Sequence, residues 1–278
     1  MSATNDAPKT TYRPAPPQLI QVKDFRDITP GLRRITFSGE NLHNYPPDCE
    51  GWHLKILLPC KGQLKPALPT LTPQGPQWQE NEVPPFIRTY SVRAIRLGQR
   101  ELDIEFALHD GAEGPALNFA RHAQPGDWIG ISNPGGPDPM LPEAKHYFMA
   151  GDPTSLPAIA ALLEKMAPDA QGKVIIRVDD ESDKQDLIKP AGVEVIWLTG
   201  DISQTDRLVN TFTSWALPER EVTFWIAGED QIVKSLRRYI RRDKGYDRQR
   251  IYAIPYWRHG YDEERYHDLR HEIMDSQD

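Results

Sequence analysis

Short runs of alternating apolar and polar residues fill the chain between residues 18 and 141. In the run HLKILLP, the side chains of Leu54, Ile56 and Leu58 fall on one face of an extended chain, with His53 and Lys55 on the other. Proline and glycine residues separate the runs, as they do at turns between strands. Several short strands at such close spacing are typical of a small barrel or sandwich. We therefore expect residues 18–141 to form a β-barrel domain, preceded by a flexible segment at residues 1–17.

A different pattern begins near residue 142. Runs rich in β-branched residues, such as KVIIRV, VEVIWL and VTFWIA, alternate with segments in which apolar residues recur at helical spacing. Leu156, Ile159 and Leu163 in SLPAIAALLEKM form one such helical series. Strand–helix alternation predicts a parallel sheet covered by helices. Residues 142–255 should form this α/β domain, of the type that binds nucleotides, and residues 256–278 should form a C-terminal tail.

Composition narrows the function classes. The 26 prolines among 278 residues exceed the usual share of about 5% and gather in the first half, where they disfavour helices. A net charge of −7 argues against general nucleic-acid binding. Cys49 and Cys60 are not part of a CxxC pair, so neither a disulfide scaffold nor a thiolate metal site is expected. With no long apolar run and no signal-peptide layout, the sequence predicts a soluble cytoplasmic protein.

The sequence lacks the motifs of several other classes. It has no G-x-S-x-G, Walker or G-x-G-x-x-G motif, which disfavours hydrolase, kinase and simple dehydrogenase functions. His267 and His271 lie four residues apart, but no third ligand accompanies them. The acidic run DDESDKQD lacks the central glycine and terminal glutamate of a calcium loop. We therefore expect no metal site.

The segment Arg88-Thr89-Tyr90-Ser91 carries the first positive signal. It resembles the R-x-Y-[ST] motif of ferredoxin-reductase-like flavoproteins. In that motif the arginine meets the flavin pyrophosphate, the tyrosine packs along the flavin and the hydroxyl contacts its N5 edge. The residue types suit these roles, because a guanidinium binds phosphate through two hydrogen bonds and an aromatic ring can cover a flat cofactor. Taken alone, the segment fits an ordinary half-buried strand equally well.

A second block, FALHDGAEGPALNFARHAQPGD, begins at Phe106 and places Pro115 where a helix can start. The N-terminus of such a helix presents backbone N–H groups that bind phosphate. The block resembles the siderophore-interacting protein family of flavin-dependent ferric-siderophore reductases, whose members read L-H-x-D-G-P-A-x-x-W-A-x-x-A-x-P-G-D. Phe119 stands where tryptophan is usual. Besides the R-x-Y-S segment, the resemblance implies an FAD-binding set of Ala107, Leu108, His109, Gly114, Pro115, Ala116, Phe119 and Ala120.

Three further blocks extend the resemblance over residues 18–267. AGDPTSLPAI resembles the family's A-G-D-E-T-A-L-P-A-I, with Pro153 in place of the acidic residue, FWIAGE resembles W-x-A-G-E, and YWRHG resembles Y-W-[RK]-x-G. The resemblance implies a ferredoxin-reductase-like fold, with the tail at residues 256–278 near the flavin. It also implies that Lys55 and Arg258 hold an anionic ferric siderophore, which a basic cluster would attract. The implied electron-donor site comprises Gly151, Asp152, Thr154, Ser155, Ala227, Gly228 and Glu229.

The function implied by these resemblances is FAD-dependent reduction of siderophore-bound Fe(III) to Fe(II). Two alternatives stay open: a general flavin or ferredoxin-type oxidoreductase, and a carrier that binds the ferric chelate without reducing it. The electron donor is open as well. Carboxylates at residues 179–181 would repel a 2′-phosphate and so favour NADH over NADPH. A predicted helix over residues 231–244 carries six basic residues that we expect to be solvated, and they could instead dock an acidic ferredoxin: Lys234, Arg237, Arg238, Arg241, Arg242 and Lys244.

Overall fold

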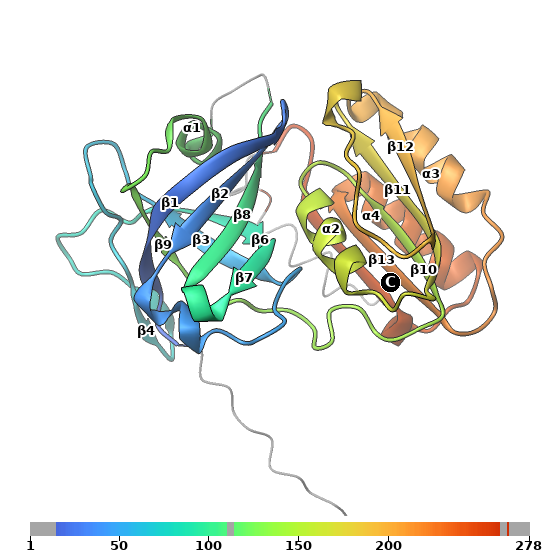
Figure 1. The fold of residues 1–278 in the computed structure, drawn as a ribbon, viewed down its shortest axis with the longest axis horizontal. Helices are drawn as coiled ribbons and strands as arrows, with labels where there is room; N and C mark the ends of the chain where they lie inside the picture. Colours follow the sequence, from blue (N-terminus) through green and yellow to red (C-terminus); the bar gives the residue numbers. More distant parts are fainter. Residues whose placement is uncertain (1–14, 110–113, 262–265, 267–278) are drawn as a thin grey trace, which may run out of the picture.

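The computed structural model describes residues 15–109, 114–261 and 266, and contains an antiparallel barrel followed by a parallel sheet covered by helices (Figure 1). The predicted fold class is confirmed. None of the helices in the described part of the chain has the length and apolar character needed to cross a bilayer.

The barrel sheet has the strand order β6-β3-β9-β1-β2-β8-β7 among the described residues, with antiparallel pairing throughout. Val92 and Arg93 alone separate β6 from β7, so the two edge strands follow each other in the chain and the sheet closes on itself. Leu54, Ile56 and Leu58 point into the barrel core, as their alternation predicted. The strands are β1 (Gln18–Thr29), β2 (Leu32–Ser38), β3 (His53–Leu58), β6 (Phe86–Ser91), β7 (Ala94–Arg96), β8 (Glu101–Ala107) and β9 (Trp128–Ile131).

Two further elements surround the barrel. The proline-rich stretch between β3 and β6 contains a small hairpin of β4 (Thr70–Thr72) and β5 (Gly75–Gln77). Helix α1 (Pro115–His122) lies over one end of the barrel (Figure 1). The proline at its first position suits a helix start, because that residue needs no N–H donor.

The second sheet has the order β12-β11-β10-β13-β14, with all strands parallel. Successive side chains of its strands alternate between the two faces of the sheet, and both faces are apolar. Helix α2 covers the face toward the barrel, and α3 and α4 cover the other face (Figure 1). Its elements are β10 (His146–Gly151), α2 (Leu156–Lys165), β11 (Gln171–Val178), β12 (Gly192–Thr199), α3 (Thr205–Thr213), β13 (Val222–Glu229), α4 (Asp230–Arg238) and β14 (Ile251–Trp257). A π-helical turn, Tyr239–Asp243, continues α4 toward Gly245, whose φ of 77° is typical of the residue that follows a helix. The predicted boundary between residues 255 and 256 falls inside β14, and the division into domains stays a prediction.

The two sheets are joined by specific contacts. Leu32 of β2 packs with the residues of α2 rather than inside the barrel, because it lies at the end of its strand nearest the second sheet. The backbone N–H of Gly31 donates a hydrogen bond of 2.7 Å to Asp183, and Lys165 of α2 pairs with Glu50. These contacts hold the turn between β1 and β2 and the segment before β3 against the second sheet and its helix α2.

Candidate functional site

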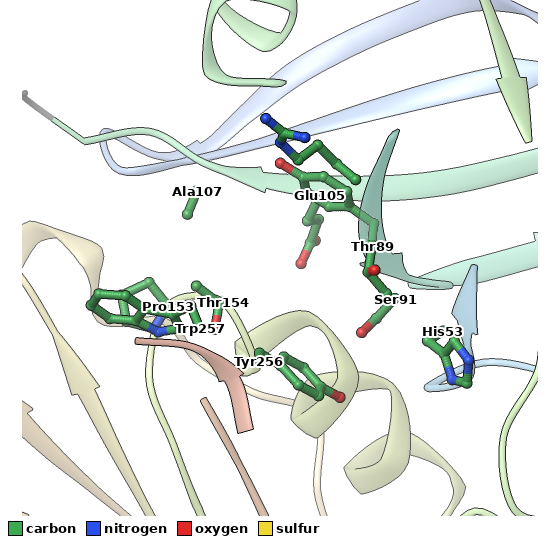
Figure 2. Close-up of a pocket in the computed structure, with 11 residues that line it drawn as sticks. His53, Thr89, Ser91, Glu105, Ala107, Pro153, Thr154, Tyr256 and Trp257 are labelled. Atoms are coloured by element: carbon green, nitrogen blue, oxygen red, sulfur yellow. The ribbon is translucent and has the colours of Figure 1, made fainter. Parts of the chain in front are cut away.

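A cavity opens between the barrel and the carboxyl ends of β10 and β14 (Figure 2). In an open α/β sheet, ligands bind at the carboxyl edge where the strand order reverses direction, which here is between β10 and β13. The barrel wall comes from β3, β6 and β8, and the opposite wall comes from the turn after β10 and the end of β14. The described residues that line the cavity are His53, Arg88, Thr89, Tyr90, Ser91, Glu105, Ala107, Pro153, Thr154, Tyr256 and Trp257.

Strand β6 brings the whole R-x-Y-S segment to the cavity. Its pairing with β3 sets Thr89 opposite Lys55, whose Nζ donates a hydrogen bond of 2.6 Å to Thr89 Oγ1. The ring of Tyr90 packs against Phe106 of the barrel core, with ring centroids 4.5 Å apart. Arg88 donates to the Ile87 carbonyl at 2.8 Å. A guanidinium, an aromatic face and two hydroxyls therefore share one wall.

The first turn of α1 has no side-chain cap. Gly114 is the N-cap, and no side chain caps the first turn, so the N–H groups of Ala116 and Leu117 are not used by a capping side chain. Ala120 is buried in the barrel core. Phe119 is partly buried and packs against the barrel core, with its ring centroid 6.2 Å from that of Phe106, and its predicted contact with the cofactor stays a prediction. Residues 110–113 of the predicted loop lie outside the described residues.

The residues at the end of β8 have two different roles: some line the cavity, and others pack on the barrel core or hold the following loop. Ala107 lines the cavity, whereas Leu108 packs on the barrel core. The backbone carbonyl of His109 accepts a hydrogen bond of 2.7 Å from Arg121 of α1. That bond ties His109, at the start of the predicted loop, to the last turn of α1.

Glu105 is a cavity residue that sequence reasoning missed. It lies two residues before Ala107, so both side chains leave the same face of β8 (Figure 2). Its side chain is only 2% exposed and pairs with Arg34 at 2.5 Å and with Arg93 at 3.5 Å. The strand alternation around Ala107 was the signal that could have found it. Glu105 thus places a buried, ion-paired carboxylate in the barrel wall of the cavity.

On the opposite wall, the turn after β10 contributes Pro153 and Thr154. The predicted donor residues Asp152 and Ser155 are fully buried, and their side chains bond within the protein. Ser155 Oγ accepts from the Asp152 N–H at 2.9 Å. These two side chains therefore shape the turn that presents Thr154, and the predicted role of Asp152 and Ser155 in donor binding stays a prediction. Gly151 belongs to the same turn and is buried as the last residue of β10.

The end of β13 has a similar supporting role. Ala227 and Glu229 are both buried, with Glu229 only 5% exposed. The carboxylate of Glu229 caps α4 by accepting from the N–H of Gln231 at 2.6 Å. Gly228, between them, has a φ of 127° and lies directly under Asp152. None of these three residues lines the described cavity.

Tyr256 and Trp257 complete the cavity from the end of β14. Burial, reinforced by Tyr252, raises the pKa of the Tyr256 phenol well above its ordinary value, and a hydrogen bond with Ser91 only partly opposes this shift. Tyr256 therefore stays protonated at physiological pH and acts as a hydrogen-bonding group, not as a base. Its contact with Ser91 links the two walls directly.

The predicted substrate residues flank the cavity without being part of its lining. Lys55 reaches it through Thr89, as described above. Arg258 follows Trp257, and its guanidinium lies 4.6 Å from the ring centroid of Tyr261. Both cations are thus next to cavity residues, on opposite walls.

A second cavity, which we call the arginine groove, shares His53 with the first. Its other lining residues in the described chain are Pro137, Arg237, Arg241, Arg248, Ile251, Tyr252, Ala253 and Ile254. The six basic residues of the helix over 231–244 were expected to be solvated. Arg237 and Arg241 contradict this, because both are partly buried and line the groove.

The acidic residues after β11 lie at the carboxyl edge of the sheet, as predicted, and are exposed. Asp179 pairs with Arg177 at 2.5 Å, and Glu181 pairs with Lys184 at 2.5 Å. Asp180 caps the next turn by accepting from the N–H of Ser182 at 2.9 Å. All three carboxylates therefore have partners while remaining at the surface.

Comparisons with known proteins identify the family. Residues 21–138 match the siderophore-interacting FAD-binding domain, and residues 144–260 match the siderophore-interacting protein domain. The chain is 36% identical over 264 residues to the ferric vibriobactin reductase ViuB of Vibrio cholerae, covering 94% of this chain and 96% of that protein. The chain belongs to the siderophore-interacting protein family.

Two further members of the family support the same conclusion. The crystal structure of the siderophore-interacting protein SipS from Aeromonas hydrophila has a TM-score of 0.82 and 46% identity, covering 94% of this chain and 99% of that one. The NADPH-dependent ferric-chelate reductase of Escherichia coli is 30% identical, covering 83% of this chain and 88% of that protein. A ferredoxin NADP+ reductase from Neisseria gonorrhoeae, at 15% identity and a TM-score of 0.58, shares the fold. The predicted ferredoxin-reductase-like fold is thereby confirmed.

The binding groups that this siderophore-interacting protein presents on the barrel side fit FAD. Arg88 and the N–H groups at the start of α1 suit its pyrophosphate, Tyr90 suits the flat face of its ring system, and Ser91 offers a hydroxyl for the ring edge. The roles of individual residues toward the cofactor stay predictions.

Proposed function

We propose that this siderophore-interacting protein is an FAD-dependent reductase that converts siderophore-bound Fe(III) to Fe(II) in the cytoplasm. The observation that supports this best is the cavity between the two sheets. It sets the flavin-type wall of β6 across from Thr154 and Trp257, on the side where a nucleotide donor would bind. Donor and cofactor would therefore meet in one enclosed space.

The names of the relatives support the same reaction. The relative from Vibrio cholerae is named a ferric vibriobactin reductase, and the one from Escherichia coli an NADPH-dependent ferric-chelate reductase. FAD supplies, when bound, the chemistry that connects a two-electron donor to a one-electron acceptor. The protein's own residues bind and orient the partners, because iron reduction needs no protein acid or base.

The charge around the cavity supports an anionic chelate as substrate. Lys55 and Arg258 flank the cavity, and the arginine groove beside it adds Arg237, Arg241 and Arg248. In a chain with a net charge of −7, this local concentration of cations would steer and hold a negatively charged ferric siderophore. His53 lines both cavities, so a chelate in the groove would lie next to the flavin wall.

The decisive experiment is anaerobic. Purified protein, reconstituted with FAD and chemically reduced, is mixed with a ferric siderophore while flavin reoxidation and Fe(II) trapped by ferrozine are followed together. A reductase yields Fe(II) in step with flavin reoxidation. A carrier would bind the chelate without yielding Fe(II), and a general flavin reductase would pass electrons to other acceptors but not to the chelate. Either result would refute the proposal.

A second experiment tests the substrate side. Arg237→Gln combined with Arg241→Gln should raise the KM for an anionic ferric siderophore about five- to thirtyfold, since partly screened cation contacts contribute roughly 0.5–1 kcal/mol each. Arg238→Gln combined with Arg242→Gln removes the same charge from exposed neighbours on the same helix and should change KM less. Equal KM values for both double variants and the wild type would exclude the arginine groove as a substrate site.

A further inference from the structure

The carboxylate of Asp152 joins the carboxyl ends of three strands. Asp152 follows β10 and is fully buried. Its Oδ2 accepts a hydrogen bond of 2.7 Å from the backbone N–H of Glu229, at the end of β13, and one of 2.8 Å from Trp257 Nε1, at the end of β14. Its Oδ1 accepts from the N–H and the hydroxyl of Thr154, at 2.9 Å and 2.6 Å. Four donors therefore converge on one carboxylate.

This arrangement satisfies a buried charge with hydrogen bonds, which is the condition for keeping a carboxylate out of water. It also requires a glycine at position 228. A Cβ on Gly228 would lie 2.5 Å from Asp152 Oδ2, and the φ of 127° at this residue disfavours any side chain. The W-x-A-G-E block thus makes room for the carboxylate of the A-G-D block, which explains in physical terms why both accompany the Y-W block.

Trp257 is the one member of this cluster with an aromatic ring in the cavity. Figure 2 shows its indole beside Pro153 and Thr154, across from Ala107 and Glu105. A tryptophan at the end of a strand can adopt several rotamers. The bond from its Nε1 to a buried acceptor selects one, because in any other rotamer Oδ2 of the buried carboxylate would lose one of its two donors.

We infer that Asp152 is a positioning residue that holds the indole of Trp257 in the wall of the flavin cavity and so sets how the electron donor's ring reaches the flavin. The inference rests on the proposed function only for the identity of the two rings. The position of the indole follows from the hydrogen bonds alone. Asp152 touches neither donor nor flavin and acts through Trp257.

The first test reads the indole directly and needs no cofactor. In ¹⁵N-labelled protein, the Trp257 indole N–H, assigned by its loss in Trp257→Phe, should resonate downfield and exchange slowly with solvent, as expected of a buried donor to a carboxylate. Asp152→Asn should move this resonance, because an amide offers a single acceptor oxygen to four donors. Asp201→Asn is the matched control, since Asp201 also accepts from an N–H two residues on, but at an exposed turn. An unmoved Trp257 resonance in Asp152→Asn would overturn the inference.

The second test measures the consequence. Trp257→Phe keeps an aromatic ring but removes the N–H, and leaves the other three hydrogen bonds to Asp152 intact. We expect it to raise the KM for a nicotinamide donor about tenfold, measured as flavin bleaching, with unchanged FAD content. Asp152→Asn should have a similar effect, and the double variant should be no worse than either single one, because both remove the same restraint. Additive effects, or a normal KM in Trp257→Phe, would contradict the inference.

Failure of the inference and failure of the proposed function are separable. The resonance and the bleaching assay contain no iron, so they decide the role of Asp152 even if the protein reduces no siderophore. Conversely, if the wild-type protein reduces a ferric siderophore while the Trp257 resonance is unmoved in Asp152→Asn, the proposed function stands and the inference fails.

Discussion

The guanidinium of Arg93, on the barrel, lies 2.5 Å from the carboxylate of Glu164, on helix α2. The same guanidinium lies 3.5 Å from Glu105, which lines the cavity. Arg93 therefore connects the cavity wall to the second sheet through two ion pairs. Because its side chain is only 10% exposed, water screens these pairs weakly.

Replacing Arg93 should therefore destabilise the whole protein. Arg93→Met leaves Glu105 buried with fewer cationic partners, and breaking a buried pair in this way costs about 3 kcal/mol. Glu164→Gln should cost about 1 kcal/mol, since Glu164 is one-third exposed. Lys173→Met, which breaks the exposed pair with Glu194, is the control and should cost less than about 1 kcal/mol. Urea unfolding checks all three, and equal losses in Arg93→Met and Lys173→Met would refute the connection.

Arg88→Ala should weaken FAD retention. A charge-assisted contact to phosphate contributes roughly 1.5–3 kcal/mol, so the affinity for FAD should fall about ten- to hundredfold. The dissociation constant can be measured by fluorescence quenching during titration of the apoprotein. Arg26→Ala removes an exposed arginine of β1, outside the cavity, and should leave the affinity unchanged. If Arg88→Ala retained FAD as the wild type does, its role in pyrophosphate binding would be wrong.

The barrel and the parallel sheet could be predicted from sequence because their signals are local. Alternation in HLKILLP and the strand–helix order after residue 142 each follow from the burial of one face of an element. Leu32 shows the limit of such reasoning. Alternation along β2 places it on the face opposite Ile35 and Phe37, and the pattern does not say what that face packs against, which for Leu32 is α2.

The site was partly predictable for the same reason. The R-x-Y-S residues all line the cavity, and they were found because the motif is contiguous in the sequence. The place of Glu105 in the wall could have been read from the alternation around Ala107, but its ion pair with Arg93 and the arginine groove were missed, because each forms only when separate segments meet. Asp152 was found as a motif residue, but the motif did not predict the burial of its carboxylate, because a sequence does not show whether a polar side chain points outward or is buried.

Acid should selectively weaken the β8 ion-pair cluster around Asp103. Burial opposes ionisation of Asp103, but hydrogen bonds from Arg96 and Thr36 outweigh it, and its pKa is lowered in the folded protein. A lowered folded pKa adds stability that is present above the unfolded value of about 3.9 and is lost as the pH falls through the folded pKa. Asp103→Asn should therefore cost about 1.5–3 kcal/mol at pH 7, the contribution of charged hydrogen bonds.

The difference between wild type and Asp103→Asn should shrink once the pH falls below about 4. Urea unfolding at pH 7, 4 and 3 measures it. Asp169→Asn, at an exposed position, should change stability little at any of these pH values. A difference that stays constant from pH 7 to pH 3 would mean that Asp103 contributes by shape and not by charge.

The acidic residues after β11 bear on the choice between NADH and NADPH as electron donor. The exposed carboxylates of Asp179, Asp180 and Glu181 follow β11, at the edge of the sheet where a dinucleotide would bind. They would repel the 2′-phosphate of NADPH, so anaerobic stopped-flow mixing should bleach the flavin faster with NADH than with NADPH. One relative is named an NADPH-dependent reductase, so kinship alone does not give this result.

The repulsion predicts two changes in the NADH-to-NADPH rate ratio. Asp180→Asn combined with Glu181→Gln keeps the cap on the turn while removing two charges, and should lower the ratio about three- to tenfold. Raising the salt concentration should lower it in the wild type as well, because exposed charges are screened. Faster bleaching with NADPH in the unmodified protein would overturn the argument. Bleaching by reduced ferredoxin alone would instead assign the donor role to a docked protein, and the exposed Arg238 and Arg242 of the helix over 231–244 would be the first residues to replace, since a docked acidic partner must cover such cations.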